Sequence, residues 1–287
     1  MQNKILVTGA TNDLGIEIIR QLSSKGVDLR AAVHSLGKAD KIGLPGVDLI
    51  KVDFDKPETL KEAFVGIDKL LLLTPFAENM VQMTENLVDQ AIKSGVGHIV
   101  KLSIINADKE RIPMTKLHRQ AEYIVGNSGI QFTFLRPNYL MQNFSTLMGA
   151  TIRIEGIFYS LNAEGKISHV DARDVAAVAT EALTKEGHHG KAYTITGSEA
   201  LSNGQIAYIL SKVIGKTVKY IMFSEDEAQK GMRAIGMSEW FINSLQGISK
   251  DQEEGHLSTI SSDVERITGR RPITFAQFAN DYINVFR

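Results

Sequence analysis

The sequence of 287 residues contains no cysteine, which excludes disulfide bonds, cysteine nucleophiles and metal sites built on thiolates. An excess of one charge is missing too, because 32 lysine and arginine residues balance 33 aspartate and glutamate residues, for a formal net charge of -1. A chain without excess positive charge has no electrostatic reason to bind nucleic acid or an anionic membrane surface. We therefore expect neither as a partner.

Long apolar runs are also absent. No stretch approaches the roughly 20 consecutive apolar residues that a membrane span needs, although 43% of the residues are hydrophobic. The chain enters an apolar strand pattern almost at once, without the basic and then apolar leader that directs export. We expect a cytoplasmic protein with no membrane span. We also predict no metal site, because His169, His188 and His189 have no carboxylate or histidine at ligand spacing.

The most informative stretch runs from Lys4 to Gly26 and reads KILVTGATNDLGIEIIRQLSSKG. Residues 5–7 are an apolar run, which predicts a buried strand. After Asn12 the apolar residues recur about every four positions, which predicts a helix. Gly9 and Gly15 lie around the turn between them. A strand, a glycine turn and a helix open a dinucleotide-binding sheet, because the free N–H groups and the dipole at the helix start favour a pyrophosphate.

The glycine pattern is the wider GxxGxxG form, with Asn12 at the middle glycine. Asparagine is the least damaging replacement, since it tolerates left-handed backbone and its amide can donate. Asp13 places a carboxylate beside the expected phosphates, which predicts weaker dinucleotide affinity. The alternative is a turn whose glycines serve packing alone. The residues that we assign to the cofactor here are Gly9, Thr11, Asn12, Asp13, Leu14 and Gly15.

Strand and helix patterns alternate along the rest of the chain as far as Pro137. This alternation predicts an α/β fold, a Rossmann-type doubly wound parallel sheet, with a smaller and mainly helical C-terminal lobe. The expected strands are 29–33, 47–52, 70–73, 98–102, 132–135 and 192–196, and the expected helices include 57–65, 80–92, 115–125 and 174–183. We assign residues 1–137 and 171–197 to an NAD(P)-binding domain, and 138–170 and 198–287 to a substrate-side lobe that closes over the carboxyl ends of the strands.

The end of the second strand determines which cofactor such a sheet prefers. An acid there accepts a hydrogen bond from the ribose 2′-OH of NAD, whereas a cation there pairs with the 2′-phosphate of NADP. This place belongs to His34, with Lys38 one helical turn further on, and no acid is present. We therefore predict that NADP(H) is favoured and that NAD(H) is possible.

The next strands end in polar and aromatic residues. Asp53 and Phe54 follow the third strand, where a carboxylate can accept from the adenine amine and a ring can lie against its face. Thr74 and Pro75 end the fourth strand and Ser103 the fifth, beside the expected path of the nicotinamide ribose. We assign all five to the cofactor site. For Asp53 the alternative is a turn or cap residue.

Several segments resemble the NmrA-like branch of the atypical short-chain dehydrogenase/reductases, and the likeness spans nearly the whole chain. It is carried by TGATNDLG, which is similar to TGATGxLG, and by DFDKPETLKEAFVGIDKLLLLTP and HRQAEYIVGNSGIQFTFLRP. The resemblance is closest to NAD(P)H:quinone oxidoreductases and related dye reductases. It implies hydride transfer from NAD(P)H to a small apolar molecule, quinone-like or otherwise conjugated.

The catalytic positions depart from the wider family, which uses tyrosine and lysine in a YxxxK helix. The resemblance places Met114 and His118 at these positions. Met114 cannot donate a proton, which argues against alcohol dehydrogenation and sugar epimerisation. His118 is the best candidate for a catalytic and cofactor-binding residue, because an unperturbed pKa near 6.5 suits proton transfer near neutrality. Tyr139 is the second catalytic candidate. The alternatives are a partly buried histidine bonded to a loop and a tyrosine that packs.

Two other functions remain open on the sequence alone. One is a redox sensor that binds NAD(P) without turnover and regulates a partner, as fungal members of the family do. The other, less favoured, is a nucleoside-diphosphate-sugar epimerase. The protein is expected to be a monomer or a homodimer. A group of methionine and aromatic residues either lines an apolar acceptor pocket or belongs to the core: Met141, Phe144, Met148, Met232, Met237, Trp240 and Phe241.

Overall fold

The computed structural model describes residues 3–35, 37, 42, 44–161 and 165–287. The chain forms two compact units, each assembled from separate segments. The first comprises Met1–Lys109, Thr115–Arg136 and Val175–Tyr193, and the second Glu110–Met114, Pro137–Asp174 and Thr194–Arg287. That the predicted divisions serve as a cofactor domain and a substrate-side lobe stays a prediction.

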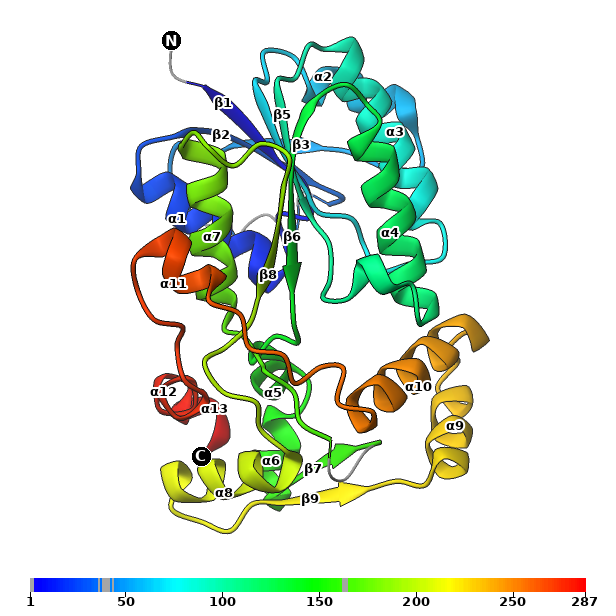
Figure 1. Ribbon diagram of the computed structural model, residues 1–287, viewed down its shortest axis with the longest axis vertical. Coiled ribbons are helices and arrows are strands. Elements are labelled where there is room, and N and C mark those ends of the chain that lie inside the picture. The colour runs from blue at the N-terminus through cyan, green and yellow to red at the C-terminus, as the bar shows by residue number, and fades with distance from the viewer. Residues whose placement is uncertain (1–2, 36, 38–41, 43, 162–164) are drawn as a thin grey trace. The chain divides into compact units, whose positions relative to one another are not determined.

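A seven-stranded sheet, counted over the described residues, has the order β3-β2-β1-β4-β5-β6-β8 (Figure 1). The paired strands from β3 to β6 all run parallel. The strand order reverses between β1 and β4, and at such a switch point ligands bind beyond the carboxyl ends of the strands. The Rossmann-type prediction is confirmed. The strands are β1 (Lys4–Val7), β2 (Asp28–Val33), β3 (Asp48–Lys51), β4 (Lys69–Leu72), β5 (His98–Leu102), β6 (Gln131–Pro137) and β8 (Lys191–Ile195).

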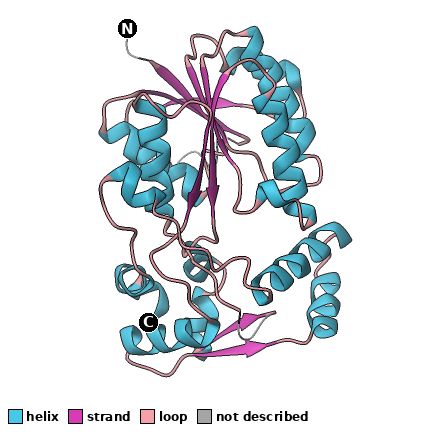
Figure 2. Cartoon of the chain, viewed as in Figure 1, coloured by secondary structure: helices cyan, strands magenta, loops and turns pink. Residues whose placement is uncertain are grey.

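Helices cover both faces of this sheet, with α1 and α7 on one face and α3 and α4 on the other (Figures 1 and 2). Each buries an apolar stripe, and α1 does so through Leu14, Ile18, Ile19 and Leu22. Burial of one such side chain contributes about 1.5–3 kcal/mol. The bounds of α1 (Asp13–Ser24), α3 (Met80–Lys93), α4 (Pro113–Gly126) and α7 (Ala172–Thr184) lie within one or two residues of the predicted ones. The predicted helix 57–65 is a short 3-10 helix, η2 (Pro57–Thr59), followed by α2 (Leu60–Ala63), and η3 (Ala107–Lys109) was not predicted.

The second unit is mainly helical, as predicted, but it also contains a two-stranded parallel sheet of β7 (Ile157–Ser160) and β9 (Lys219–Met222). The sequence analysis missed this sheet, because β9 is mostly exposed and lacks an alternating pattern. The helices are α5 (Gln142–Thr146), α6 (Gly149–Glu155), α8 (Asn203–Ile214), α9 (Glu225–Ala234), α10 (Glu239–Glu253), α11 (Asp263–Thr268), α12 (Phe275–Asp281) and α13 (Ile283–Phe286).

An aromatic cluster forms the core of the second unit. Phe144 meets Phe275 edge to face with 5.1 Å between ring centroids, and Phe278 and Phe286 extend the cluster. Met141 and Phe144 are 1% and 4% exposed and belong to this core. For these two residues the structure favours the core over an acceptor pocket.

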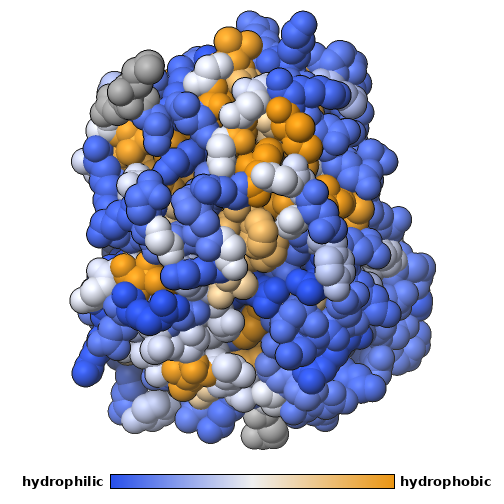
Figure 3. All heavy atoms as spheres, turned by 45° about the horizontal axis from the view of Figure 1, so that its top comes forward, coloured by the Kyte–Doolittle hydropathy of each residue, from blue (hydrophilic) through white to orange (hydrophobic). Residues whose placement is uncertain are grey.

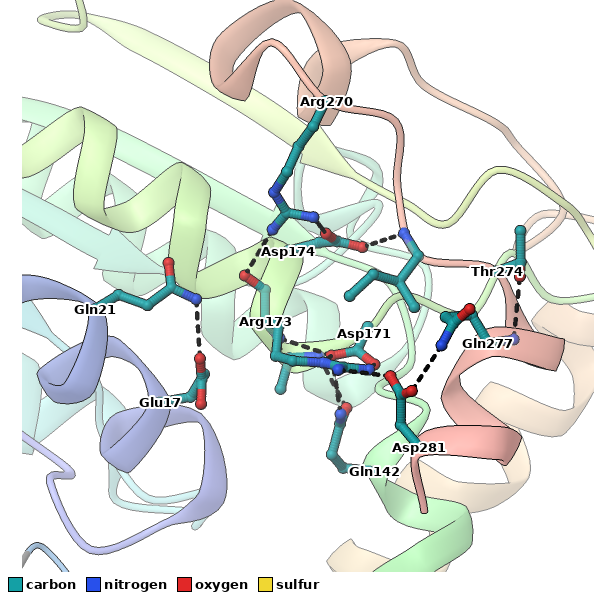
Figure 4. A network of polar contacts seen from close by, with 12 residues as sticks. Glu17, Gln21, Gln142, Asp171, Arg173, Asp174, Arg270, Thr274, Gln277 and Asp281 are labelled. Carbon is teal, nitrogen blue, oxygen red and sulfur yellow. Dashed lines mark hydrogen bonds and ion pairs between the residues drawn. The ribbon is translucent and has the colours of Figure 1, made fainter. Parts of the chain in front are cut away.

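A polar network ties the start of α7 to the C-terminal helices of the second unit (Figure 4). Arg173 donates to both carboxylate oxygens of the buried Asp171, at 2.9 and 2.8 Å, and to Asp281 at 2.7 Å. Asp174 is also buried, and it accepts from Arg270 and from the backbone N–H of Ile273 at 2.8 Å. Each buried carboxylate therefore has a charged partner, which its burial requires.

Hydrophilic residues predominate on the face drawn in Figure 3, and apolar residues gather mainly in the upper middle of that face. Among the residues that the structure describes, no helix combines the length and the apolar character that a bilayer crossing requires.

Candidate cofactor-binding and active site

The turn between β1 and α1 requires both of its glycines. Gly9 has a φ of 63°, and a Cβ on it would lie 2.3 Å from Cδ2 of Leu73. A Cβ on Gly15 would lie 2.3 Å from the carbonyl oxygen of Gly9. These are contacts within the protein, so the glycines alone do not separate cofactor binding from packing. The argument for cofactor binding rests on the cavities beside this turn.

Asn12 replaces the middle glycine as the cap of α1. Its φ of -86° and ψ of 163° are extended, so the left-handed backbone that the sequence suggested is not used. Its Oδ1 accepts from the backbone N–H of Gly15 at 2.7 Å. The first intrahelical bond runs from the N–H of Ile16 to the carbonyl oxygen of Asn12. The N–H groups of Asp13 and Leu14 precede that bond and remain for a ligand.

A cavity of about 310 Å³ opens beside this turn. It brings together six of the predicted cofactor residues from the ends of four strands. Three apolar residues, Ala32, Val52 and Leu73, complete the lining and were not foreseen. The predicted residues in the lining are Gly9, Thr11, Asn12, His34, Phe54 and Pro75.

A second cavity, of about 400 Å³, shares His34 and Val52 with the first. It is lined by Lys51 and Lys56, cations that the sequence analysis missed. The pairing of β2 with β3 explains the position of Lys51 in this cavity. Lys51 pairs with Val33, the residue before His34, so it lies beside the end of β2. Lys38, the predicted cation, lies outside the described residues.

Asp53 lines the second cavity and also holds a turn. Its Oδ1 accepts from the backbone N–H of Asp55 at 3.1 Å, and its Oδ2 lies 3.5 Å from Nζ of Lys56. The turn that was the alternative for Asp53 is therefore present. Its contact with adenine stays a prediction.

Thr74 and Ser103 end adjacent strands. Leu72 of β4 pairs with Lys101 of β5, so the residues two positions later end side by side. The hydroxyl oxygen of Thr74 is buried and has no hydrogen-bond partner within the described part of the chain, whereas the buried hydroxyl of Ser103 interacts with the Glu122 carboxylate. Buried polar atoms are normally bonded, so the unpaired hydroxyl of Thr74 calls for an explanation, and a bound ligand would provide one.

His118 lies on the inner side of α4 and is partly buried. Its Nδ1 is buried without a partner among the described residues, which disfavours the loop-bonded alternative for that nitrogen. Burial disfavours the imidazolium and Lys101 adds charge of the same sign, so the pKa of His118 lies well below its usual value. The expectation of an unperturbed pKa near 6.5 is therefore wrong, and the imidazole is neutral at pH 7.

Glu122, one helical turn beyond His118, is 1% exposed. It accepts from Nε and Nη2 of Arg136 at 2.9 and 2.7 Å, and from Arg119 at 3.0 Å. Burial opposes ionisation, but these guanidinium groups outweigh it, with help from nearby Ser103, and hold the pKa of Glu122 below its usual value. The sequence analysis used Glu122 only as a reference point and missed this buried charge.

Lys101 is the other residue that the sequence analysis missed. Its side chain is 0% exposed although it carries an ammonium group. Burial lowers the pKa of Lys101 to about 8, against the opposing effect of the Glu122 carboxylate. A lysine within a central strand, two residues before Ser103 and thus on the same face, was the available signal.

Tyr139 belongs to the second unit, where its ring lies 6.5 Å from that of His169. Burial and the charge of Asp251 raise the pKa of Tyr139 above its usual value, so its hydroxyl stays protonated. Burial lowers the pKa of His169 to about 4. The packing that was the alternative for Tyr139 is present, and its catalytic role stays a prediction.

One group of side chains in the second unit has the spacing of metal ligands. Asp251, Glu254 and His256 each place one ligand atom within 4.8 Å of the others, as a search of the described residues finds. Nε2 of His256 lies 3.2 Å from Glu254, so these two groups already pair. His169, His188 and His189 take no part in it. The absence of a metal site stays a prediction.

Comparison with known proteins gives consistent matches. The NmrA-like family matches residues 1–271. The chain is 34% identical over 283 residues to the NAD(P)H azoreductase of Xenophilus azovorans, covering 98% of this chain and 99% of that one. Its fold is similar to that of the NADPH-dependent quinone oxidoreductase of Escherichia coli complexed with NADPH, with a TM-score of 0.85, 26% identity and coverage of 96% and 99%. The fold is also similar to that of the triphenylmethane reductase of Citrobacter sp. complexed with NADP(H). The TM-score is 0.85 at 27% identity, and the match covers 97% of this chain and 99% of that one.

Proposed function

Because the chain belongs to the NmrA-like family, we propose that it is an NAD(P)H-dependent reductase that transfers hydride to a quinone-like or other conjugated small molecule. Relatives named as azo, quinone and dye reductases support this reaction class. The observation that carries the proposal is the pair of unpartnered buried polar atoms on Thr74 and His118, near the carboxyl ends of β4 and β5. Such atoms fit the polar edge of a nicotinamide ribose.

The cofactor, when bound, supplies the hydride. The chain's own residues bind and orient it. The N–H groups of Asp13 and Leu14 suit the pyrophosphate, and the cavity around His34 suits the adenosine half. Thr74 and Ser103 suit the ribose, beside the neutral His118. Met114 offers no acidic proton, so catalysis rests on placing donor and acceptor together.

The first prediction concerns the reaction itself. The protein should oxidise NADPH in the presence of menadione, an azo dye or malachite green, and should leave secondary alcohols untouched when NADP⁺ is supplied, because Met114 cannot act as the family's tyrosine. The loss of NADPH absorbance measures turnover. Tight cofactor binding without turnover of any acceptor would contradict the reductase and favour the sensor alternative.

The second prediction concerns cofactor choice. NADPH should bind about tenfold more tightly than NADH, because a charge-assisted hydrogen bond to a phosphate is worth roughly 1.5–3 kcal/mol. Lys51 and Lys56 line the cavity beside His34, so the double substitution K51Q/K56Q should remove most of the preference and leave NADH affinity nearly unchanged.

Calorimetric titration with both cofactors provides the measurement. Lys61→Gln is the matched control, since Lys61 is an exposed lysine on the nearby α2 that does not line the cavity. A preference that survives the double substitution would show that other residues bind the phosphate. The cytoplasmic location and the state of monomer or homodimer stay predictions.

A further inference from the structure

The C-terminal end of α10, inside the second unit, brings three potential metal ligands together. Asp251 and Glu254 lie on one side of the helix, because residues three apart in an α-helix are neighbours. Gly255 then reverses the chain with a φ of 79°, and His256 follows it. One ligand atom from each of Asp251, Glu254 and His256 lies within 4.8 Å of the other two. Atoms this close can reach one shared cation with small side-chain adjustments, since Zn²⁺ binds nitrogen and oxygen at about 2.0–2.2 Å.

The turn that brings His256 back to the helix is a Schellman motif. The backbone N–H of His256 donates to the carbonyl oxygen of Asp251 at 2.9 Å, and that of Gly255 donates to the carbonyl oxygen of Gln252 at 3.0 Å. The two positions that Asp251 and His256 occupy in this motif commonly carry apolar side chains that pack together. Here they carry a carboxylate and an imidazole. The backbone therefore holds two metal-ligating side chains in a place that usually serves packing.

The carboxylate of Asp251 is buried and lacks a hydrogen-bond donor among the residues that the structure describes. Asp251 is 4% exposed, and only the charges of His256 and Arg111 favour its ionisation, against burial, which raises its pKa. Other buried carboxylates of this unit, those of Asp171 and Asp174, each accept hydrogen bonds from a guanidinium group. Buried charges are normally paired or bound to a metal. The contact between Glu254 and His256 needs no metal, but it leaves Asp251 unexplained.

A cation can reach this group from solvent. Glu254 and His256 have side chains that are 46% and 30% exposed. Glu254 also lines a cavity of about 510 Å³ to which α9 and α10 contribute. The described lining of this cavity includes Glu225 and Glu253 as well, and Lys250 is its one cationic side chain. An excess of negative charge around a cavity raises the local concentration of cations.

We infer that Asp251, Glu254 and His256 form a binding site for one divalent transition-metal ion such as Zn²⁺. One imidazole nitrogen and two carboxylate oxygens suit Zn²⁺ and Co²⁺, whereas Mg²⁺ and Ca²⁺ prefer oxygen ligands alone. Water completes the coordination. The ion joins the last turn of α10 to the segment after it. This inference departs from the prediction of no metal site, which considered three other histidines, and it does not depend on the proposed reductase function.

Competition with a chromophoric chelator measures the binding. The full-length protein, without a polyhistidine tag and stripped of metal with EDTA, should take up one Zn²⁺ per chain, and excess Mg²⁺ should not displace it. Loss of a group that merely supports a ligand costs about tenfold to a hundredfold in metal affinity. Asp251→Asn removes a ligand charge and should therefore weaken Zn²⁺ binding by about a hundredfold or more. Glu253→Gln is the matched control, because it removes the same charge from an exposed neighbour outside the group and should leave affinity nearly unchanged.

Equal Zn²⁺ affinity in the wild-type protein and in Asp251→Asn would overturn the inference, as would a wild-type protein that takes no Zn²⁺ from the chelator. Circular dichroism establishes that each variant is folded. His256→Gln, at a partly exposed position, provides the same comparison if Asp251→Asn does not fold. The titrations contain no cofactor or acceptor, so their outcome is separate from that of the reductase assay.

Two further measurements place the ion at these residues. Co²⁺ is paramagnetic and should broaden the NMR signals of the His256 imidazole before those of the other histidines, with His256→Gln identifying these signals. Zn²⁺ should also raise the thermal unfolding temperature of the wild-type protein, because a ligand that binds the folded state stabilises it by mass action. Asp251→Asn should show a much smaller rise at the same Zn²⁺ concentration. Broadening that spares His256, or an equal rise in both proteins, would contradict the assignment.

Discussion

Gly15→Ala is expected to weaken NADPH binding by about a hundredfold or more. The added Cβ would lie 2.3 Å from the carbonyl oxygen of Gly9 and 3.1 Å from Cα of Ala10, and both are backbone atoms that no side-chain rotation can move aside. The turn must therefore shift relative to the start of α1. The loss of two hydrogen bonds to a phosphate, at roughly 1.5–3 kcal/mol each, corresponds to about a hundredfold or more in affinity.

Calorimetric titration measures this loss, with circular dichroism and thermal unfolding to establish that the variant is folded. Gly231→Ala in α9 is the matched control, because nothing lies within 4 Å of its added Cβ and its φ is not positive. The control should bind NADPH as the wild-type protein does. Wild-type affinity in Gly15→Ala would mean that the turn does not hold the pyrophosphate.

Arg136→Met is expected to produce the largest loss of stability, about 3–5 kcal/mol in the free energy of unfolding. The substitution removes two of the three guanidinium hydrogen bonds to Glu122, whose side chain is 0% exposed, and leaves the buried carboxylate with Arg119 as its remaining guanidinium partner. The penalty arises from the uncompensated charge rather than from the lost bonds.

Urea unfolding of a small set of variants tests this account. The double variant Glu122→Met with Arg136→Met should recover most of the loss, because the Glu122 carboxylate is no longer buried without Arg136. Arg233→Met breaks an exposed ion pair with Glu239 and should change stability little. A double variant as unstable as Arg136→Met alone would show that lost packing, and not the buried charge, causes the effect.

Much of the fold follows from periodicity in the sequence. The change from a two-residue to a nearly four-residue period around Gly9 predicts β1 and α1, and the predicted strand 98–102 coincides with β5. The small sheet of β7 and β9 was not predicted, because short and mostly exposed strands have no such apolar pattern. Local sequence therefore predicts elements well when one face of them is buried.

The candidate site was predictable as a set of places but not in its electrostatics. Strand ends identify His34, Asp53, Thr74 and Ser103 without any structure. The low pKa of His118 depends on the burial of its side chain and on the charge of Lys101. His118 lies on α4, whereas Lys101 lies on β5. A charge interaction between residues far apart in the sequence leaves no local pattern. The sequence therefore identifies the residue types at the site but not their pKa values.

The discontinuous make-up of the two units has a consequence for synthesis on the ribosome. Strand β6 ends at Pro137, but its neighbour β8 begins only at Lys191, after the chain has formed α5, α6, β7 and α7. Until β8 emerges from the exit tunnel, the nascent chain exposes one edge of β6 with free N–H and carbonyl groups. Unpaired strand edges promote aggregation. We therefore expect the nascent chain to be prone to aggregation through this edge while residues 138–190 are translated.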